Sequence, residues 1–432
     1  MTETLVGFAG MTHLGLVSAT ATADKGFRTV CFDTSRDRIE ALARRELPVT
    51  EPDLAELFDK NFEHQKFTTS LDDLANCDVV YVAPDVATDD SGVSDLTEVQ
   101  NLILLVMPVL RQDAILIVLS QVPPGFTRAL RSDPKRIFYQ VETLIFGAAV
   151  IRATLPERFI VGAADPSVKL PAVYREILES FNCPILPMRY ESAELAKISI
   201  NMFLTASVST TNMLAEICER MGADWFEIAP ALRLDRRIGQ HAYLQPGLGL
   251  SGGNLERDMT TITGLGDALG GDVGNVRSWQ FNSRHRRDWV LAMLHRHVLA
   301  HRKGQADTTL AILGLAYKAG THSTKNSPAV ALLDATRSFN ARVYDPIVVA
   351  DPAWHPSLVE AENPLDACDG SNVLAIMSPW PEFRNLDPKA ISRALAGRVI
   401  LDPYGLLDYK SCQAAGLKHH RIGVVPLSTV SP

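Results

Sequence analysis

The start of the chain alternates between short apolar runs and a helical pattern, and this order constrains the fold more than any other feature. The apolar run Leu5–Ala9 reads as a buried strand, and Gly10 opens a turn after it. A helix is expected over Leu14–Ala23, ends at Gly26 and is followed by a strand over Arg28–Asp33. Strand-like runs recur further on as DVVYVAPD and AILIVLSQ. Such alternation predicts a doubly wound parallel sheet.

The middle of the chain has a different pattern. Residues 192–221 contain neither Gly nor Pro and carry apolar residues at helical spacing. We therefore expect one long helix there, which would form a spine between domains and a dimer surface. Residues 276–299 also have a helical pattern.

A second sheet of the nucleotide-binding type is expected near the C-terminus. LAILGLAYKAGT, at residues 310–321, repeats the order of strand and glycine turn, and VYDP and NVLAIMSPW follow as later strands. The polar segment His301–Thr309 suits a linker before it. The predicted fold class is therefore α/β, with two Rossmann-like doubly wound parallel-sheet domains, residues 1–188 and 306–432, joined by a central helical region, residues 189–300.

Composition narrows the class of protein and its partners. The 432 residues suffice for two or three domains, and 46% of them are hydrophobic and 21% charged, as in ordinary globular proteins. The formal net charge of −8 argues against a nucleic-acid binder, and no apolar run is long enough to span a membrane. The six cysteines lack metal-ligand spacing, and the N-terminus lacks a secretory signal. We therefore expect a cytoplasmic protein with reduced thiols and no metal.

The glycine turn after the first strand has the order of a dinucleotide-binding fingerprint. Gly10, Thr12 and Gly15 take the three glycine positions. A helix N-terminus at this place binds a pyrophosphate, and the Thr12 hydroxyl can donate to a phosphate. Asp33, at the end of the next strand, suits the ribose hydroxyls of NAD and would repel the ribose phosphate of NADP, which Arg38 could otherwise accept. The alternative is an ordinary helix–strand turn with an acidic strand end.

Beyond this turn, a set of motifs follows in order along nearly the whole chain. They are EPDL (Glu51–Leu54), SGVSDL (Ser91–Leu96), SQVPPGFT (Ser120–Thr127), VETLIFGAAV (Val141–Val150), LPERFIVG (Leu155–Gly162), SAELAKISIN (Ser192–Asn201), DRRIG (Asp235–Gly239), PGLGLSGGNLERD (Pro246–Asp258), GLAYKAGT (Gly314–Thr321), NSPA (Asn326–Ala329), YDP (Tyr344–Pro346) and WPEF (Trp380–Phe383). In this order the chain resembles the UDP-glucose/GDP-mannose dehydrogenase family.

The resemblance implies an oxidoreductase with NAD as cofactor and a nucleotide-activated sugar as substrate. Members of the family oxidise a primary alcohol of the sugar to a carboxylate in two hydride transfers, through a thiohemiacetal and a thioester on a cysteine. Residues 1–188 would bind NAD, residues 189–300 would hold the dimer contact and substrate, and residues 306–432 would bind the nucleotide of the sugar. The residues expected at the cofactor are Gly10, Thr12, His13, Leu14, Asp33, Arg38, Pro84, Gln121 and Arg257.

Three further residues match the family's group beside the reacting sugar: Lys197, Asn201 and Asp258. Lys197 and Asn201 are four residues apart in the predicted long helix and so project from one face. Removal of a hydride needs a base for the hydroxyl proton and a donor for the developing oxyanion. Lys197, or a water held by Lys197 and Asp258, is the expected base, and Asn201 the donor. Glu142 is either a general base for hydrolysis or a carboxylate that braces its loop.

Several positions depart from the family pattern. The family cysteine aligns with Asn254, whose amide is no nucleophile. Gln121 replaces a threonine that helps to place water, segment Val141–Gly147 lacks an arginine and a carboxylate, and the proline-threonine turn becomes Pro84-Asp85-Val86. These losses fall mainly on the second half of the family reaction. We therefore predict one hydride transfer, with Asn254 bound to the substrate or its carbonyl product. The alternatives are a full four-electron dehydrogenase and a protein that binds the same ligands without catalysis.

The resemblance also implies a set of substrate-binding residues. Arg237 is expected to reach across a homodimer formed through the central helix, and Lys318 to face the diphosphate. Asp402–Gly405 replaces a family segment and lacks its arginine, which favours an unusual base or sugar. A specialised pathway, such as one that builds an antibiotic sugar, would suit an enzyme that keeps hydride transfer and omits acid formation. The expected substrate residues are Thr143, Leu144, Tyr243, Leu244, Gly252, Arg237 and Lys318.

Overall fold

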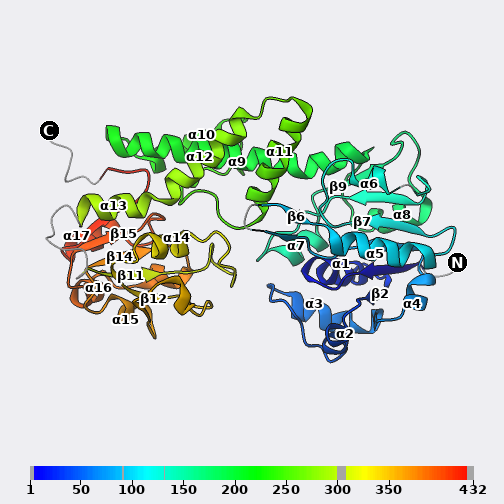
Figure 1. The fold of residues 1–432 in the computed structure, drawn as a ribbon, viewed down its shortest axis with the longest axis horizontal. Coiled ribbons are helices and arrows are strands. Elements are labelled where there is room, and N and C mark those ends of the chain that lie inside the picture. The colour runs from blue at the N-terminus through cyan, green and yellow to red at the C-terminus, as the bar shows by residue number, and fades with distance from the viewer. Residues whose placement is uncertain (1–3, 90–91, 131, 299–307, 426–432) are drawn as a thin grey trace. The chain divides into compact units, whose positions relative to one another are not determined.

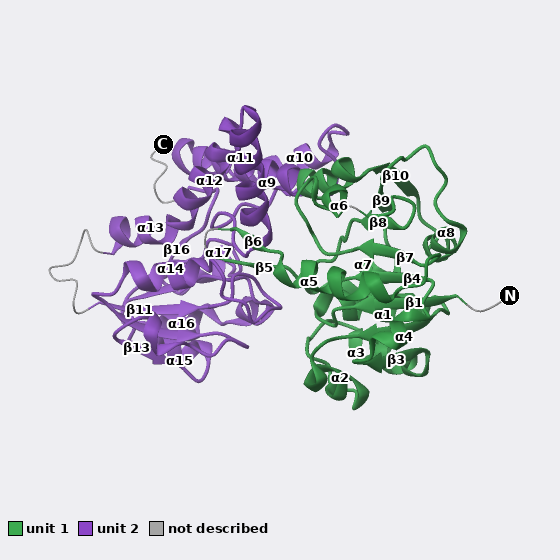
Figure 2. Ribbon diagram, turned by 45° about the vertical axis from the view of Figure 1, so that its right-hand side comes forward, with its two compact units in different colours: residues 1–200 green, residues 201–432 purple. Residues whose placement is uncertain are grey.

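A computed structural model describes residues 4–89, 92–130, 132–298 and 308–425 of the chain (Figure 1). The chain divides into two compact units, residues 1–200 and 201–432 (Figure 2). Each unit contains one large sheet of mainly parallel strands, and a run of helices separates the two sheets in sequence. The predicted fold class is therefore confirmed. The predicted domain limits stay a prediction, and most of the predicted linker, His301–Thr309, lies outside the described residues.

The sheet of the first unit has the strand order β10-β9-β8-β7-β4-β1-β2-β3. Neighbouring strands pair in parallel except β8 and β9, which are antiparallel. An antiparallel strand at the side of a parallel sheet is common in folds of this class. The strands are β1 (Leu5–Ala9), β2 (Arg28–Phe32), β3 (Gln65–Thr68), β4 (Val79–Val82), β7 (Ile115–Val118), β8 (Ile137–Gln140), β9 (Phe159–Ala163) and β10 (Ile185–Arg189), with a small hairpin of β5 (Ala87–Thr88) and β6 (Ser94–Asp95).

Both faces of this sheet are buried, which explains why its strands are continuous apolar runs. Along β4, Val79 and Tyr81 belong to one buried cluster, and Val80 and Val82 belong to another. Helix α1 contributes to the first cluster and α5 to the second, so helices cover both faces. The helices of this unit are α1 (His13–Asp24), α2 (Arg36–Ala43), α3 (Leu54–Lys60), α4 (Leu71–Ala75), α5 (Thr97–Val106), α6 (Phe126–Ala129), α7 (Ala149–Thr154) and α8 (Ala172–Glu179).

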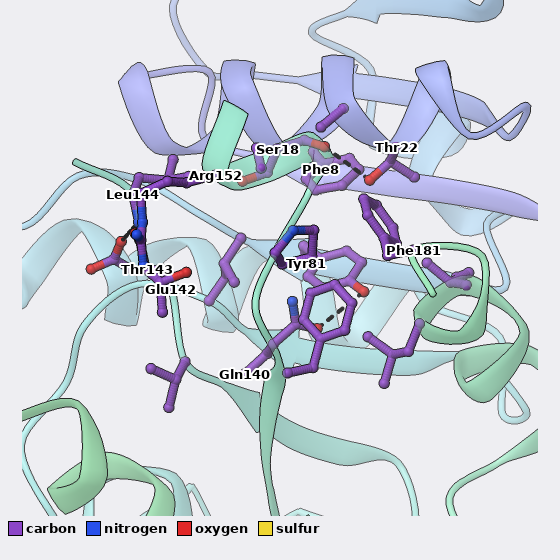
Figure 3. A pocket seen from close by; sticks show the side chains of 18 residues that line it. Phe8, Ser18, Thr22, Tyr81, Gln140, Glu142, Thr143, Leu144, Arg152 and Phe181 are labelled. Carbon is purple, nitrogen blue, oxygen red and sulfur yellow. Dashed lines mark hydrogen bonds between the residues drawn. The ribbon is translucent and has the colours of Figure 1, made fainter. Parts of the chain in front are cut away.

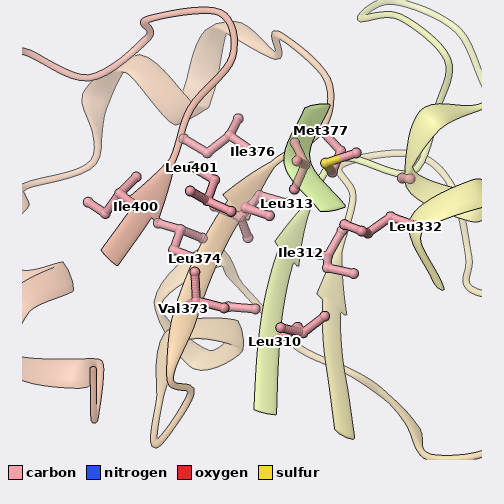
Figure 4. Packing of buried hydrophobic residues seen from close by; sticks show 14 of the residues in the cluster. Leu310, Ile312, Leu313, Leu332, Val373, Leu374, Ile376, Met377, Ile400 and Leu401 are labelled. Atoms are coloured by element: carbon pink, nitrogen blue, oxygen red, sulfur yellow. The ribbon is translucent and has the colours of Figure 1, made fainter. Parts of the chain in front are cut away.

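The sheet of the second unit is parallel throughout and has the order β13-β12-β11-β14-β15-β16. This is the 3-2-1-4-5-6 order of nucleotide-binding sheets. Apolar side chains of its central strands, among them Leu313, Leu374 and Leu401, form the core (Figure 4). The strands and helices are β11 (Thr309–Leu313), α14 (Pro328–Ala335), β12 (Asn340–Tyr344), β13 (Leu358–Glu360), α15 (Pro364–Cys368), β14 (Val373–Ile376), α16 (Pro388–Ala394), β15 (Val399–Leu401), α17 (Tyr409–Ala414) and β16 (Lys418–His420).

The long helix predicted in the middle of the chain is confirmed as α9 (Tyr190–Met221), which has 32 residues. No glycine or proline interrupts it, so the backbone ladder continues without a break. The helical pattern over residues 276–299 forms two helices, α12 (Gly274–Arg287) and α13 (Trp289–His297), which separate at Asp288. The remaining helices of this region are α10 (Trp225–Leu234) and α11 (Asn254–Leu269).

Candidate active site

The turn between β1 and α1 brings backbone groups into close contact. Gly10 has a φ of +95°, and a Cβ atom on Gly15 would lie 1.9 Å from the carbonyl oxygen of Gly10. Glycine is therefore needed at both positions. The Gly10 N–H donates to the carbonyl oxygen of Phe32 at 2.9 Å and joins the turn to the end of β2. This is the geometry in which a dinucleotide pyrophosphate meets a helix N-terminus.

Asp33 follows β2, and its buried carboxylate faces this turn. Its Oδ2 accepts hydrogen bonds from the Met11 N–H and from Nη1 of Arg38, both at 2.7 Å. Its Oδ1 accepts from the Ser35 N–H at 2.8 Å. The Arg38 guanidinium is therefore paired with Asp33 and is not presented alone to a ribose phosphate. A carboxylate at this place suits the ribose hydroxyls of NAD and repels the additional phosphate of NADP.

A carboxylate from another loop lies at the N-terminus of α1. Asp85 Oδ2 accepts a hydrogen bond from the His13 N–H at 2.8 Å, and the Asp85 N–H donates to Oγ1 of Thr12 at 2.8 Å. Pro84 packs on the same turn, because a Cβ on Gly10 would lie 2.8 Å from the Pro84 nitrogen. The glycine turn and Asp33 thus fit NAD, and the Asp85 carboxylate accepts the first N–H of α1.

The His13 side chain connects this turn to the loop that follows β8. Its Nε2 lies 2.9 Å from Oε1 of Glu51, and its ring stacks on Phe146 with centroids 4.4 Å apart. Glu51 also accepts the Gly147 N–H at 2.9 Å. Glu51 is 7% exposed. Glu51 belongs to the EPDL motif, for which the sequence predicted no role. Its partner His13 is 38 residues away in the chain, so no local pattern indicated the contact.

Helix α9 presents Lys197 to Glu142 within the first unit. Lys197 Nζ lies 2.6 Å from Glu142 Oε1, and the two side chains are 12% and 17% exposed. Glu142 Oε2 also accepts the N–H of Leu144 at 2.9 Å. The pair is therefore largely shielded from water and its geometry permits a proton to move between nitrogen and oxygen. The sequence predicted as base either Lys197 itself or a water held by Lys197 and Asp258, and in the structure Lys197 contacts Glu142.

A cavity of about 60 Å³ lies beside Glu142 in the first unit (Figure 3). Thr143 and Leu144, both predicted to bind substrate, line it, and Nε of Arg152 donates to the Thr143 carbonyl oxygen at 2.6 Å. Gln140, whose Oε1 accepts a hydrogen bond from the hydroxyl of Tyr174 at 2.9 Å, provides a further polar group of the lining.

One turn further along α9, in the second unit, Asn201 contacts Asp258. Asn201 Nδ2 donates to Asp258 Oδ2 at 2.6 Å, and Nε of Arg257 donates to Asp258 Oδ1 at 3.2 Å. Asp258 and Arg257 are 0% and 7% exposed, so the pair is buried and balanced in charge. An amide has two N–H donors, and the contact with Asp258 engages one of them. Arg257, predicted at the cofactor, is thus held by Asp258.

The backbone of the glycine-rich loop before α11 packs closely against neighbouring residues. A Cβ on Gly249 would lie 2.3 Å from the Ser283 carbonyl oxygen, and a Cβ on Gly252 would lie 2.8 Å from the Tyr317 ring. Their φ angles are +72° and +82°. The loop ends at Asn254, the first residue of α11, whose side chain is exposed. A helix N-terminus stabilises a thiolate, but it gives an amide no nucleophilic character.

A cavity of about 690 Å³ lies against this loop in the second unit. Tyr243 and Phe226 line it, together with Arg384 and Tyr404 from the segments that follow β14 and β15. Ligands of such sheets bind outside the carboxyl ends of the strands, where these two segments lie. The sequence indicated Tyr243 and the segment around Tyr404. It missed Phe226 and Arg384, although the position of Arg384 after a buried strand was a usable signal.

Other predicted residues are not part of the lining of this cavity. The Leu244 side chain is 8% exposed, and the Leu244 carbonyl oxygen accepts a hydrogen bond from Nε1 of Trp225 at 2.8 Å. The Arg237 side chain is 89% exposed and pairs with Asp235 at 2.7 Å. Lys318 Nζ lies 5.7 Å from the centre of its neighbour's ring. Leu14 and Gln121, predicted at the cofactor, are 6% and 9% exposed.

The described residues contain neither a metal-binding cluster nor a membrane-spanning helix. Among them, no group of three or more His, Cys, Asp or Glu side chains could hold a metal ion. No helix within these residues is long and apolar enough to cross a bilayer. The six cysteines are free, and burial raises the pKa of thiols such as Cys31, to about 12, which makes them poor nucleophiles.

Comparison with protein families gives three consecutive matches. Residues 4–182 match the NAD binding domain of the UDP-glucose/GDP-mannose dehydrogenase family, residues 191–282 match its central domain, and residues 311–409 match its UDP binding domain. Among curated proteins, the chain is 28% identical over 441 residues to the UDP-glucose 6-dehydrogenase TuaD of Bacillus subtilis. That alignment covers 97% of this chain and 93% of TuaD.

Solved structures of similar proteins have the same fold. A UDP-glucose dehydrogenase from Pyrobaculum islandicum superposes with a TM-score of 0.84 at 23% identity, covering 98% of each chain. A UDP-D-ManNAc dehydrogenase from Pyrococcus horikoshii superposes with a TM-score of 0.83 at 21% identity, covering 97% of this chain and 99% of that one. At these identities the likeness concerns the fold.

Proposed function

Because the chain belongs to the UDP-glucose/GDP-mannose dehydrogenase family, we propose that this NAD-dependent nucleotide-sugar dehydrogenase oxidises its substrate once and releases a carbonyl product. The proposal is supported by Asn254 at the start of α11, which is the position to which the resemblance assigns the family cysteine. No cysteine is found among the described residues that line the larger cavity. Without a thiolate, the carbonyl product cannot be held as a thiohemiacetal for a second hydride transfer.

The first oxidation needs a proton acceptor, and we assign this role to Lys197 and Glu142. NAD, when bound, supplies the acceptor for the hydride. The 2.6 Å contact lets Nζ of Lys197 pass a proton to Glu142 and take the hydroxyl proton of the sugar in its place. The hydroxyl oxygen then becomes the carbonyl oxygen of the product.

The same step also needs a donor for the negative charge that develops on the oxygen. Asn201 has one N–H bound to Asp258, and its second N–H suits this task. Asp258 is itself held by Arg257, so the amide stays in one orientation. Asn254 binds the sugar or its carbonyl product as a neutral hydrogen-bonding group. A secondary alcohol would give a ketone, and a primary alcohol would give an aldehyde.

The larger cavity supports a nucleotide as the carrier of the sugar. The rings of Phe226, Tyr243 and Tyr404 suit the faces of a base, and Arg384 suits a phosphate. The UDP binding domain that the chain matches, and the UDP-sugars in the names of the similar enzymes, support a UDP-linked sugar. An enzyme that stops at the carbonyl fits a specialised pathway, such as one that builds an antibiotic sugar.

A homodimer through the central helix is part of the same proposal. Phe203, Met213, Ile217 and Met221 are 46–79% exposed on α9. At 100° per residue they lie within about 80° of one another, so they form one apolar stripe. Such a stripe on a helix usually packs against a partner.

We also propose a cytoplasmic location, because the free cysteines suit a reducing compartment.

The deciding experiment is a panel of UDP-, GDP- and dTDP-sugars with NAD, in which reduced cofactor and product mass are measured together. One reduced cofactor per sugar and a product lighter by two hydrogens would support a single oxidation. Two reduced cofactors and an acid product would show that another group replaces the cysteine. Ligand binding without any cofactor reduction, across the whole panel, would support a non-catalytic binder.

A further inference from the structure

Helix α1 is capped by a side chain that is distant in sequence. Thr12, at the N-cap, makes no capping hydrogen bond with its side chain. Asp85, which follows β4, supplies the cap instead, because its Oδ2 accepts the N–H of His13 at 2.8 Å. The Asp85 N–H donates in turn to Oγ1 of Thr12 at 2.8 Å, which fixes the loop in this position. The result is a carboxylate held on the first N–H of a 12-residue helix.

This N–H is the group that a dinucleotide-binding unit offers to the pyrophosphate. A helix N-terminus favours one anion through its dipole and its N–H groups, and a second anion at the same place is repelled. The pyrophosphate and the Asp85 carboxylate therefore compete for it. The segment that carries Asp85 packs directly on the glycine turn, since a Cβ on Gly10 would lie 2.8 Å from the Pro84 nitrogen.

The surroundings of Asp85 are acidic, which strengthens the competition. Burial raises the pKa of Glu98, and the charges of Asp33, Asp85 and Asp95 raise it further, so all three carboxylates lie close enough to act on Glu98. Arg38 is the cation that offsets them, and it is bound to Asp33 at 2.7 Å. An incoming pyrophosphate thus meets negative charge at the position where it needs donors.

We propose that Asp85 is an internal competitor of the cofactor, which occupies the pyrophosphate position in the free protein and must leave it when NAD binds. The affinity for NAD is lowered by the free energy needed to separate the carboxylate from the helix. Asp85 therefore sets the concentration of NAD at which the enzyme becomes loaded. The inference concerns binding of the cofactor alone and does not depend on the number of oxidations.

Two substitutions distinguish the effect of the negative charge of Asp85 from the effect of its hydrogen bond with the His13 N–H. In Asp85→Asn the amide oxygen can still accept the His13 N–H, but the charge is gone, whereas Asp85→Ala removes both. Asp113→Asn is the matched control, because it makes the same change in charge at an exposed position before β7, at the amino end of the strands, whereas Asp85 lies at the carboxyl end. All proteins keep their native length, and thermal unfolding verifies that each is folded.

Binding of NAD and of ADP-ribose is measured by calorimetry without any sugar, and adenosine serves as a ligand that lacks the pyrophosphate. We expect Asp85→Asn and Asp85→Ala to bind NAD and ADP-ribose on the order of tenfold more tightly, and adenosine with unchanged affinity. Asp113→Asn should bind all three as the unchanged protein does. Unchanged or weaker binding of NAD by both Asp85 variants would overturn the proposal, whatever the outcome of the turnover assays.

Discussion

The ion pair between Lys197 and Glu142 allows a test that separates catalysis from bracing of the loop. We consider Lys197→Met, Glu142→Gln and the double variant. Methionine keeps most of the length of lysine without its charge, and glutamine keeps an oxygen that can accept the Leu144 N–H, which Glu142 binds at 2.9 Å. The three proteins and the unchanged enzyme form a double-mutant cycle.

The burial of the pair sets the expected loss of stability. With 12% and 17% of the two side chains exposed, the pair lies between a surface and a buried ion pair. Removal of one partner costs about 0–1 kcal/mol at the surface and about 3–5 kcal/mol in the interior. We therefore expect Lys197→Met to lower the free energy of unfolding by about 2 kcal/mol, and the double variant to regain about half of that loss.

Turnover should follow a different pattern from stability. If Lys197 accepts the hydroxyl proton, both variants that lack it lose roughly 10²–10⁴ in the rate of NAD reduction, including the double variant with its regained stability. Urea unfolding and initial rates are measured on the same preparations. Lys60→Met is the control, since its pair with Asp24 is at the surface of the same unit, with 66% of the lysine side chain exposed. A folded Lys197→Met that retains its rate within about tenfold would refute the assigned role.

Three further predictions concern single substitutions. Gly15→Ala should cost at least ~3 kcal/mol in unfolding and abolish NAD binding in calorimetry, because its Cβ would lie 1.9 Å from a carbonyl oxygen, whereas the helical Gly264→Ala, with open space, should be neutral or stabilising. Burial raises the pKa of Glu256 from 4.5 to about 7, so this group lowers stability as pH rises from about 4.5 to about 7. Glu256→Gln should remove that dependence and add about 1–2 kcal/mol at pH 8 in urea unfolding, because partial exposure of this carboxyl screens part of the effect, and an unchanged pH profile would contradict it. Phe203→Asp should convert dimers to monomers in sedimentation, and a protein that is monomeric before the substitution would contradict the apolar stripe on α9.

Local patterns in the sequence predicted much of the fold. Continuous apolar runs predicted the strands because both faces of each sheet are covered, and the absence of glycine and proline predicted α9. The glycine turn at Gly10 and the carboxylate at Asp33 were also predictable, because a βαβ unit brings the ends of adjacent parallel strands together at one edge. The split of residues 276–299 into two helices was not predictable, since nothing at Asp288 resembles a breaker.

The sequence therefore determined which side chains are candidates for the site, whereas the tertiary structure decided which residue each of them contacts. Lys197 was expected near Asp258, but its 2.6 Å contact is with Glu142, which is 55 residues away in the chain. Asp85 was noted only as a departure, and its role as the cap of α1 depends on a contact across 72 residues. Side-chain spacing within one helix or strand follows from local geometry, which the sequence determines directly. Contacts between loops depend on how the packed sheet places their ends, and that information exists only once the core has formed.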